Sequence, residues 1–430
     1  MSHLRQAWNL YNLMKSQWKS YEELRELQDR KLRAILKHAY ENVPLYRQKF
    51  ASAGVHPEDI KTVADLPKLP ITTKQEVRDN FPDRIVANGV DTGKCWLPHT
   101  GGSTGIPLTV AYDEAAEDFQ KAVALRPNLS CGQGLFDKWI VFTDPRHIGE
   151  KKWFQRIGLF NPTQFSLFED IDNQVLILKK AKPDIIDTYP SHLYLLAKKV
   201  NQIGVEIRPK MVFTTAELLD SQTREHIQSV FNAPIYDQFG DVEMGRTAWE
   251  CPAHSGYHID VEAVIMEFIR DEKPVSSGER GEIVYTTLYN YAMPLIRYAV
   301  GDIGIPSDEK CLCGRGLPLM KIIEGRKDDF LVRSDGTIVS PITMDLIIKN
   351  MMAIEQCRII QETPGRVRVQ IVNSHSLTEQ IVSQLKSSIK EVLGENVSVE
   401  TEMLAELLRD KSGKLRKVIS KVKIDWHKGW

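Results

Sequence analysis

Apolar and charged residues alternate with a helical period in the first part of the chain. Between Tyr21 and Phe50, leucine and alanine recur at near-helical spacing with charged residues between them. Apolar residues repeated in this way form one face of an amphipathic helix. We therefore predict that residues 1–52 are helical, that the Pro-Lys-Leu-Pro segment 67–70 ends this pattern, and that Thr73 caps a further helix.

Short β-rich runs alternate with helical runs from about residue 95 to residue 320. This alternation predicts βαβ units and a largely parallel sheet, because parallel neighbours need a crossover that is usually a helix. The predicted strands are 139–143, 184–187, 211–214 and 235–239, and the predicted helices are 175–181, 190–203 and 221–231.

The pattern changes twice towards the C-terminus. From Gly281 onward it becomes short strands and turns, and after about Arg326 a smaller α/β segment begins. We predict two domains, 1–326 and 327–430. Within the second, the predicted strands are 356–362, 366–372 and 397–402, and the predicted helix is 377–393.

Composition narrows the class of protein. The chain has 430 residues, and its 56 Lys plus Arg nearly balance its 57 Asp plus Glu, so no charged block indicates nucleic-acid or membrane binding. The first twenty residues lack the apolar stretch of a signal peptide, and no run of about 18 apolar residues predicts a membrane span. The six cysteines are too few and scattered for a disulfide scaffold. We expect a cytoplasmic protein.

The segment 99–107 is rich in glycine and hydroxyls and ends in proline. Glycine permits positive φ and close backbone approach, and consecutive N–H groups and hydroxyls can hold phosphate oxygens. An ordinary turn is the alternative. No Gly-Lys-Ser/Thr follows, which disfavours a P-loop kinase or ATPase, and the spacing does not match Gly-x-Gly-x-x-Gly. The candidate phosphate-binding residues are Thr100, Gly101, Gly102, Ser103, Thr104 and Gly105.

Two polar motifs follow predicted strands. Ala216 and Glu217 come after the strand 211–214, at the end of a parallel strand where ligands bind, so they are placed to stack a base. Glu243 follows the strand 235–239, and a carboxylate there can hold Mg²⁺ beside phosphate oxygens. A helix cap is the simpler interpretation of the first motif.

Three further motifs lie closer to the C-terminus. Asp302 can accept both hydroxyls of a ribose, the segment Glu324–Asp329 lies at the predicted domain junction, and Lys414 lies in a flexible turn. Taken singly, each is more typical of a turn, a strand pairing or a solvated loop.

In this order, the motifs resemble the adenylate-forming ligase superfamily of acyl-CoA synthetases, luciferases and peptide-synthetase adenylation domains. The closer resemblance is to the phenylacetate–CoA ligases and the CapK-type capsule-biosynthesis proteins. It covers nearly the whole chain, including Leu36–Arg47, which is similar to the N-terminal signature of this branch. The resemblance implies an α/β fold with a large N-terminal adenylate-forming domain of mixed β-sheets and helices and a small mobile C-terminal α/β domain.

The resemblance also implies a role for each motif. Residues 100–105 would hold the ATP phosphates, Glu243 would bind Mg²⁺, Lys414 would stabilise charge during adenylation, and Asp328 would be the hinge of the C-terminal domain. The residues implied to bind the adenosine are Ala216, Glu217, Asp237, Gln238 and Phe239 at the adenine, and Asp302 and Arg326 at the ribose.

Four positions depart from the family pattern. Gly101 stands where a serine is usual, and Ile106 and Leu108 stand where one of two positions usually carries a lysine, so a cation near the β- and γ-phosphates is lost. Val242 replaces a hydroxyl residue that would contact the phosphate or the substrate carboxylate. These departures leave room for a slow enzyme or an inactive relative.

A separate set of cysteines and histidines predicts a metal site. Cys251 precedes a predicted strand together with His254 and His258, and Cys311 and Cys313 form a Cys-x-Cys-Gly knuckle downstream. Thiolates with one imidazole favour tetrahedral Zn²⁺, and four filled positions imply a structural role. His258 is the preferred fourth ligand and His254 the alternative; without a metal these are buried thiols. The resemblance points the same way, because relatives carry a similar set.

The sequence thus predicts a two-domain ligase that uses ATP and Mg²⁺ to adenylate a small, aryl or other, carboxylic acid. Coenzyme A is the expected acceptor, with a carrier-protein thiol or an amine as alternatives. The rival hypothesis is a non-catalytic nucleotide-binding or assembly protein of a polysaccharide or natural-product pathway. Glu243, Asp302, Arg326 and Lys414 together argue against it, because a scaffold has no need of all four. The identity of the acid and the oligomeric state stay open.

Overall fold

The computed structural model describes residues 2–100, 107–149, 151–349, 351, 354–373, 377–410 and 413–424. Its chain forms two compact units, Met1–Gly134 with Tyr236–Ile323, and Leu135–Ile235 with Glu324–Trp430. The predicted division into 1–326 and 327–430 stays a prediction, because compactness does not show which parts move together. Among the described residues, none of the helices has the length and apolar character needed to cross a bilayer.

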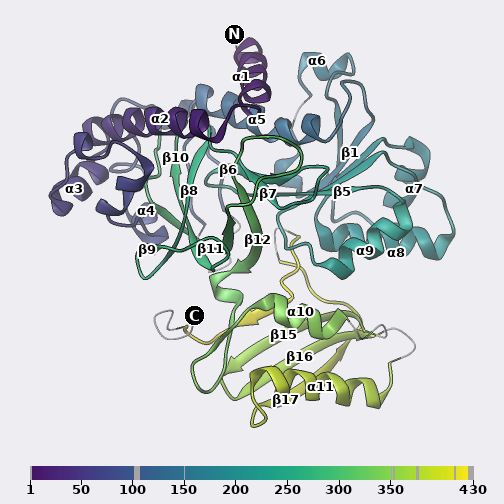
Figure 1. Ribbon diagram of the computed structural model, residues 1–430. Helices are drawn as coiled ribbons and strands as arrows, with labels where there is room; N and C mark the ends of the chain where they lie inside the picture. The colour runs from purple at the N-terminus through teal and green to yellow at the C-terminus, as the bar shows by residue number, and fades with distance from the viewer. Residues whose placement is uncertain are drawn as a thin grey trace. The chain divides into compact units, whose positions relative to one another are not determined.

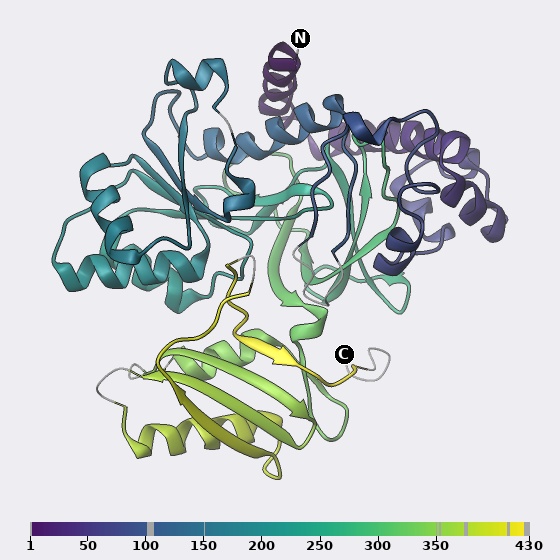
Figure 2. The ribbon, with the colours of Figure 1, turned by 180° about the vertical axis from the view of Figure 1, so that it is seen from behind.

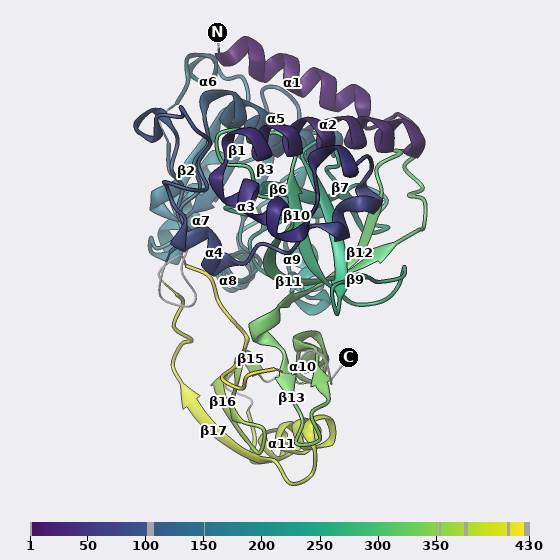
Figure 3. The same cartoon turned by 90° about the vertical axis from the view of Figure 1, so that its left-hand side faces the viewer.

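The first unit begins with the predicted helices, which confirms the helical start. Ser20 begins the second helix with a capping box completed by Glu23, and Thr73 caps α4 in the same way. Helix α1 lies beside α5 (Figure 3). The helices of this unit are α1 Ser2–Ser16, α2 Tyr21–Asn42, α3 Pro44–Ala53, α4 Lys74–Asp79 and α5 Glu114–Ser130, with 3₁₀ turns η1 Pro57–Asp59, η2 Val63–Lys68 and η3 Thr92–Lys94.

The sheet of the first unit has the order β5-β6-β7-β12-β11-β10-β8-β9 (Figure 1). Its registered pairs are antiparallel. The prediction of a largely parallel sheet is therefore wrong here, because connections such as 242–244 are too short for a crossover. The strands are β5 Ile235–Asp241, β6 Gly245–Glu250, β7 Tyr257–Ile259, β8 Val264–Arg270, β9 Lys273–Pro274, β10 Gly281–Thr287, β11 Tyr298–Ser307 and β12 Leu319–Arg326.

The second unit contains the predicted strands 139–143, 184–187 and 211–214 as the parallel strands β1, β3 and β4, together with β2, which was not predicted. They have the order β2-β1-β3-β4 and pack with the helices around a core that includes Phe142, Leu193 and Phe231. Helix α7 begins earlier than predicted, at Ile171, because Asp170 caps it. The elements are β1 Trp139–Thr143, η4 Pro145–His147, α6 Trp153–Arg156, β2 Pro162–Ser166, α7 Ile171–Ala181, β3 Ile185–Thr188, α8 Pro190–Ile203, β4 Met211–Thr215 and α9 Ser221–Phe231.

The C-terminal part of the second unit is the smaller α/β segment predicted from the sequence. Its sheet has the order β17-β16-β15-β18, and helix α11 packs on it through Leu385, Ile389 and Leu393 (Figures 1 and 2). The elements are η5 Lys327–Asp329, β13 Leu331–Val332, β14 Ile338–Val339, α10 Pro341–Lys349, β15 Ile354–Thr363, β16 Arg366–Asn373, α11 Glu379–Leu393, β17 Ser398–Leu404 and β18 Val418–Ser420. The predicted α/β fold with mixed sheets is confirmed.

Candidate functional site

A short antiparallel stem carries the predicted phosphate-binding loop. Thr100 donates its N–H to the Leu108 carbonyl at 2.9 Å, and its hydroxyl accepts from the Leu108 N–H at 2.9 Å. His99 pairs with Thr109 one step further along. The structure thus places Thr100 at the mouth of the loop. The other five predicted phosphate-binding residues, Gly101, Gly102, Ser103, Thr104 and Gly105, lie outside the described residues.

Glu243 lies at the tip of a tight hairpin between β5 and β6. Asp241 pairs with Gly245, and its carboxylate accepts the Met244 N–H at 2.6 Å. A Cβ at Gly240 would lie 2.3 Å from the Gly245 carbonyl oxygen, so only glycine fits there. The local sequence therefore fixes the backbone of the hairpin that carries Glu243.

A lysine that sequence reasoning missed lies beside Glu243. The Glu243 side chain is buried, Lys74 Nζ lies 3.2 Å from its Oε1, and Tyr298 donates its hydroxyl to the same oxygen at 2.9 Å. Lys74 is the first residue of α4, whose cap Thr73 orients it. The cap was readable from the sequence, but the pairing joins distant segments and was not. A cation thus lies beside the predicted metal ligand.

Asp302 lies in the same unit as Glu243. It is buried in β11. Burial is the largest cause that raises the pKa of Tyr285, and the charges of Asp241, Asp302 and Glu243 add to it. The charges of the predicted ribose acid and of the predicted metal ligand therefore both act on one buried tyrosine.

The β5 residues predicted to line the adenine are held by neighbours in their own unit. Asp237 accepts the Tyr257 hydroxyl at 2.7 Å, and Gln238 donates to Asn128 at 3.0 Å. Phe239 packs at the edge of the unit's core. Successive residues of a strand face opposite sides, so the shared adenine role stays a prediction.

Ala216 and Glu217 lie in the second unit, at the turn after β4. Ala216 has φ 71°, a conformation uncommon for a residue other than glycine. The Glu217 carboxylate accepts the backbone N–H of Ser191 at 2.9 Å and its hydroxyl at 3.0 Å. The turn is therefore a constrained one, fastened to the start of α8.

The same unit holds the predicted lysine and hinge. Lys414 donates its backbone N–H to Asp410 Oδ1 at 3.0 Å, and the next residue, Leu415, donates its N–H to Glu217 Oε1 at 2.7 Å. Arg326 ends β12 and precedes η5, which contains Asp328. The structure brings Lys414 to the Glu217 turn; the roles of Arg326 and Asp328 stay predictions.

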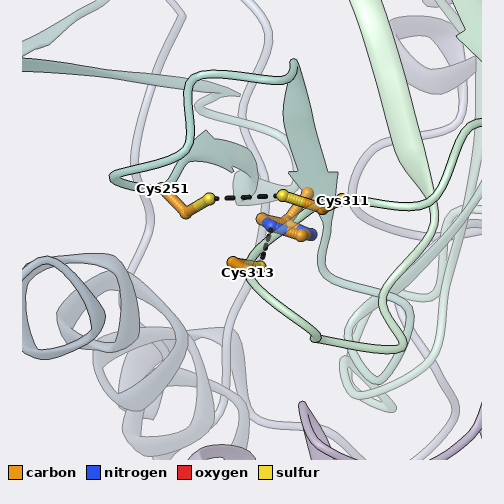
Figure 4. A group of neighbouring side chains, drawn as sticks. Cys251, Cys311 and Cys313 are labelled. Atoms are coloured by element: carbon orange, nitrogen blue, oxygen red, sulfur yellow. Dashed lines mark hydrogen bonds between the residues drawn. The ribbon is translucent and has the colours of Figure 1, made fainter.

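The cysteines and one histidine of the predicted metal site come together in the first unit. Cys251 follows β6, His258 lies in β7, and Cys311 and Cys313 lie between β11 and β12 (Figure 4). Their ligand atoms all lie within 4.8 Å of one another. Cys251 Sγ is 3.5 Å from Cys311 Sγ, and Cys313 Sγ is 3.3 Å from His258 Nε2. Ligands of a tetrahedral zinc ion are separated by about 3.3–3.8 Å.

The protonation states of this cluster also suit a metal. Burial lowers the pKa of His258 to about 4, which leaves the neutral imidazole that binds metals. Burial raises the pKa of Cys251 to about 12, so a cation is needed to hold its thiolate. His254, the alternative ligand, lies outside the cluster: its ring stacks on Tyr236, and its Nδ1 lies 3.8 Å from Glu250.

The two residues that follow the knuckle and its glycine pack against the N-terminal segment between α1 and α2. The Arg315 guanidinium lies 4.6 Å from the Trp18 ring and 5.4 Å from the Trp249 ring, and it donates to Gln17 at 2.8 Å. Gly316 is packed so closely that a Cβ would lie 1.9 Å from the Lys19 carbonyl oxygen. The cluster is therefore built into the core of its unit.

Comparisons with known proteins agree with this architecture. The family model described as the CapK C-terminal domain matches residues 331–421. The phenylacetate-coenzyme A ligase of Escherichia coli (strain K12) is 31% identical over 332 residues, 73% of this chain and 73% of the relative. The phenylacetate-coenzyme A ligase of Aromatoleum evansii is 29% identical over 436 residues, 94% of this chain and 95% of the relative.

A solved structure shares the fold. The 2-hydroxyisobutyryl-CoA ligase, in the postadenylation state in complex with R3-HIB-AMP, has a TM-score of 0.78 and 20% sequence identity. The match covers 95% of this chain and 91% of that chain. At this level of identity, the likeness establishes the fold and leaves the activity to the residues of the site.

Proposed function

Because the chain belongs to the phenylacetate–CoA ligase family of the adenylate-forming superfamily, we propose that it adenylates a small carboxylic acid with ATP and transfers it to coenzyme A. The observation that carries the proposal is the retention of Glu243, Asp302, Arg326 and Lys414 in one chain. A non-catalytic nucleotide-binding protein has no need of all four. The names of the relatives support an aryl acid as substrate and coenzyme A as acceptor.

The chemistry explains why these residue types are needed. A carboxylate oxygen attacks the α-phosphorus, pyrophosphate leaves, and the resulting acyl-adenylate carries a good leaving group. The coenzyme A thiol then attacks the acyl carbon, loses its proton and displaces AMP. Charge develops on phosphate oxygens in the first step, so fixed positive groups supply much of the catalysis. Lys414 would provide one of them.

Glu243 fits a magnesium ion by its chemistry. Mg²⁺ takes oxygen ligands and commonly binds through one or two carboxylates together with substrate phosphates. Glu243 offers a buried carboxylate at a hairpin tip. When bound, the ion would neutralise phosphate charge.

Lys74 is proposed to supply the cation that the loop positions Ile106 and Leu108 lack. Its ammonium lies against Glu243, the predicted metal ligand. We expect Lys74→Met to slow ATP–pyrophosphate exchange, whereas Lys68→Met, which removes an exposed pairing with Asp65, should not. Equal activity of the two variants would contradict this role.

The Cys251, His258, Cys311 and Cys313 cluster is proposed to hold one structural Zn²⁺. Four protein ligands leave no open coordination position, so the ion would stabilise the knuckle rather than act on substrate.

The deciding experiment is ATP–pyrophosphate exchange with a panel of aryl, aliphatic and amino acids, phenylacetate included. Exchange with one class, followed by thioester formation when coenzyme A is added, is the expected result. Exchange without thioester would favour a carrier-protein or amine acceptor. No exchange with any acid, in protein shown to bind ATP, would favour the assembly role that the departures at Ile106, Leu108 and Val242 suggest.

A further inference from the structure

The loop that carries Lys414 is fastened to the turn after β4 by contacts that no motif predicted. We call the described residues of 409–417 the lysine loop; it connects β17 to β18 and is yellow in Figure 2. It belongs to the same compact unit as α8 and α9. The contacts between these segments are therefore internal to one unit.

Glu217 is the centre of the first contact. One oxygen, Oε1, accepts both the Ser191 hydroxyl at 3.0 Å and the Leu415 N–H at 2.7 Å, while Oε2 accepts the Ser191 N–H at 2.9 Å. Arg409 donates to the Ser191 hydroxyl and to the Gly413 carbonyl, both at 2.8 Å. One carboxylate thus ties the residue after Lys414 to the start of α8.

Asp220 makes the second contact. It accepts Lys417 Nζ at 2.6 Å while capping α9 through the Thr223 N–H at 2.8 Å. The Asp220 side chain is 14% exposed and that of Lys417 is 35% exposed, so the pair is partly shielded from solvent. Opposite charges held this way restrain the loop on the far side of Lys414.

The close packing of Gly413 is further evidence that the lysine loop lies against the rest of its unit. Its φ is 80°, and a Cβ at this position would lie 2.4 Å from the Leu167 Cδ1 atom. The residue immediately before Lys414 therefore lies closely against the segment after β2. Arg416 also binds Asp329 in η5, next to the predicted hinge residue.

The described contacts of this docking are mostly polar. A pocket of about 50 Å³ that is open to solvent lies beside them, bordered by Ser191, Asp220, Leu415 and Lys417 among others. Solvent can therefore reach the edge of the contacts that hold the loop.

We propose that Glu217 and Asp220 are positioning residues that fasten the lysine loop and so present Lys414 for the adenylation half-reaction. The proposal rests on the proposed function and deepens it: Lys414 supplies the charge, and the two carboxylates determine where it lies. Because Lys414 is proposed to act in adenylation alone, the two half-reactions should respond differently when the fastening is lost.

The test breaks the Asp220–Lys417 ion pair by substituting each partner in turn. Lys417→Met deletes the cation, and Asp220→Asn removes the charge while keeping a good helix cap for α9. The matched control is Lys421→Met, which deletes an exposed lysine that follows β18 and pairs with Glu362. Three quantities are measured: ATP–pyrophosphate exchange with the acid identified in the panel, thioester formation from supplied acyl-adenylate and coenzyme A, and hydrogen exchange of the Leu415 amide.

In Lys417→Met and Asp220→Asn, we expect the kcat of exchange to fall about fivefold, because a partly exposed ion pair contributes at most about this factor to the positioning of the loop. The KM for ATP and the thioester step should change less than about twofold, within the spread expected for surface changes. The Leu415 amide should exchange faster, and the double variant should be no worse than either single one. Lys421→Met should match the wild type.

Two results would overturn the proposal. Unchanged pyrophosphate exchange and unchanged protection of Leu415 would show that the pair does not hold the loop. Equal losses in both half-reactions would indicate a general structural role. Failure of the proposed function is distinguishable, because it would appear as absent exchange in the wild type, while hydrogen exchange of Leu415 would still decide whether the pair fastens the loop.

Discussion

The Cys/His cluster and the lysine loop are both built from segments far apart in the chain, yet they are held in different ways. The cluster lies among strands of one antiparallel sheet, and Cys251, Cys311 and His258 are buried. The lysine loop is held by a few hydrogen bonds and ion pairs, and Lys414 itself is half-buried. The predicted structural metal site is set into the core, whereas the lysine proposed to act in adenylation lies in a loop held by partly exposed polar contacts.

The two regions should also differ in how much they contribute to the free energy of unfolding. Removing one member of a buried set of charged groups costs several kcal/mol, roughly 3–5 kcal/mol where a buried charge loses its partner. Contacts at a partly exposed seam contribute about 0.2–1 kcal/mol each. Substitutions in the two regions should therefore change different observables: stability for the cluster, and the balance of half-reactions for the loop.

The largest effect is expected from Cys311→Ser. Loss of a thiolate ligand should abolish stoichiometric zinc binding and lower the Tm by about 10 °C or more, as the loss of several kcal/mol of metal-binding free energy implies. Metal analysis of the purified protein, about one zinc per chain in the wild type, and thermal unfolding measure this. Cys95→Ser, outside the cluster, is the control. A wild-type protein without zinc would contradict the site.

The next effect is expected from Lys414→Ala. Removing a charge that acts on the transition state should lower the rate of adenylate formation about 100- to 1000-fold. Binding of ATP, measured by calorimetry, should weaken far less. Equal losses in rate and binding would show that Lys414 serves only to hold the nucleotide. The Tm should stay close to that of the wild type, in contrast to Cys311→Ser.

A smaller effect separates the two half-reactions. Asp328→Pro fixes φ at the predicted hinge and should slow thioester formation about tenfold more than adenylation. Asp328→Ala, which removes the carboxylate but leaves φ free, is the control. If the ratio of the two rates does not change in the proline variant, residue 328 is not the hinge.

The smallest effect is expected from substitution of His254, and it tests whether His258 or His254 is the fourth metal ligand. His254→Ala should retain zinc and shift the Tm by no more than about 3 °C, because this ring is part-exposed and lies outside the cluster. His258→Ala should lose the metal. The opposite outcome would make His254 the ligand.

The elements that could be predicted from the sequence are those whose ends carry local capping or turn residues. The helix 190–203 begins at Pro190 and is followed by the cap Gly204, and the helix 221–231 begins after the cap Asp220, so their bounds were readable. The direction of β5 to β12 was not predicted, because alternation of short strands does not reveal which connections are hairpins.

Within the candidate sites, residue types were easier to predict than partners. The thiolate set was clear from its Cys-x-Cys-Gly spacing, but only the register of β6, β7 and β12 brings His258 to it. Lys74 beside Glu243, and Leu415 on Glu217, are contacts between segments far apart in the chain. No periodicity or motif specifies such pairs, since they depend on how the sheet and its helices pack.

The Lys74–Glu243 pair has a consequence for how the protein responds to chelators. A buried carboxylate is costly unless a partner neutralises it, and here the chain supplies its own counter-ion. The β5–β6 hairpin thus does not depend on a divalent ion for its shape. A chelator such as EDTA should leave this hairpin folded in nucleotide-free protein, so that the proposed magnesium ion would enter together with the nucleotide at a hairpin whose shape does not depend on it.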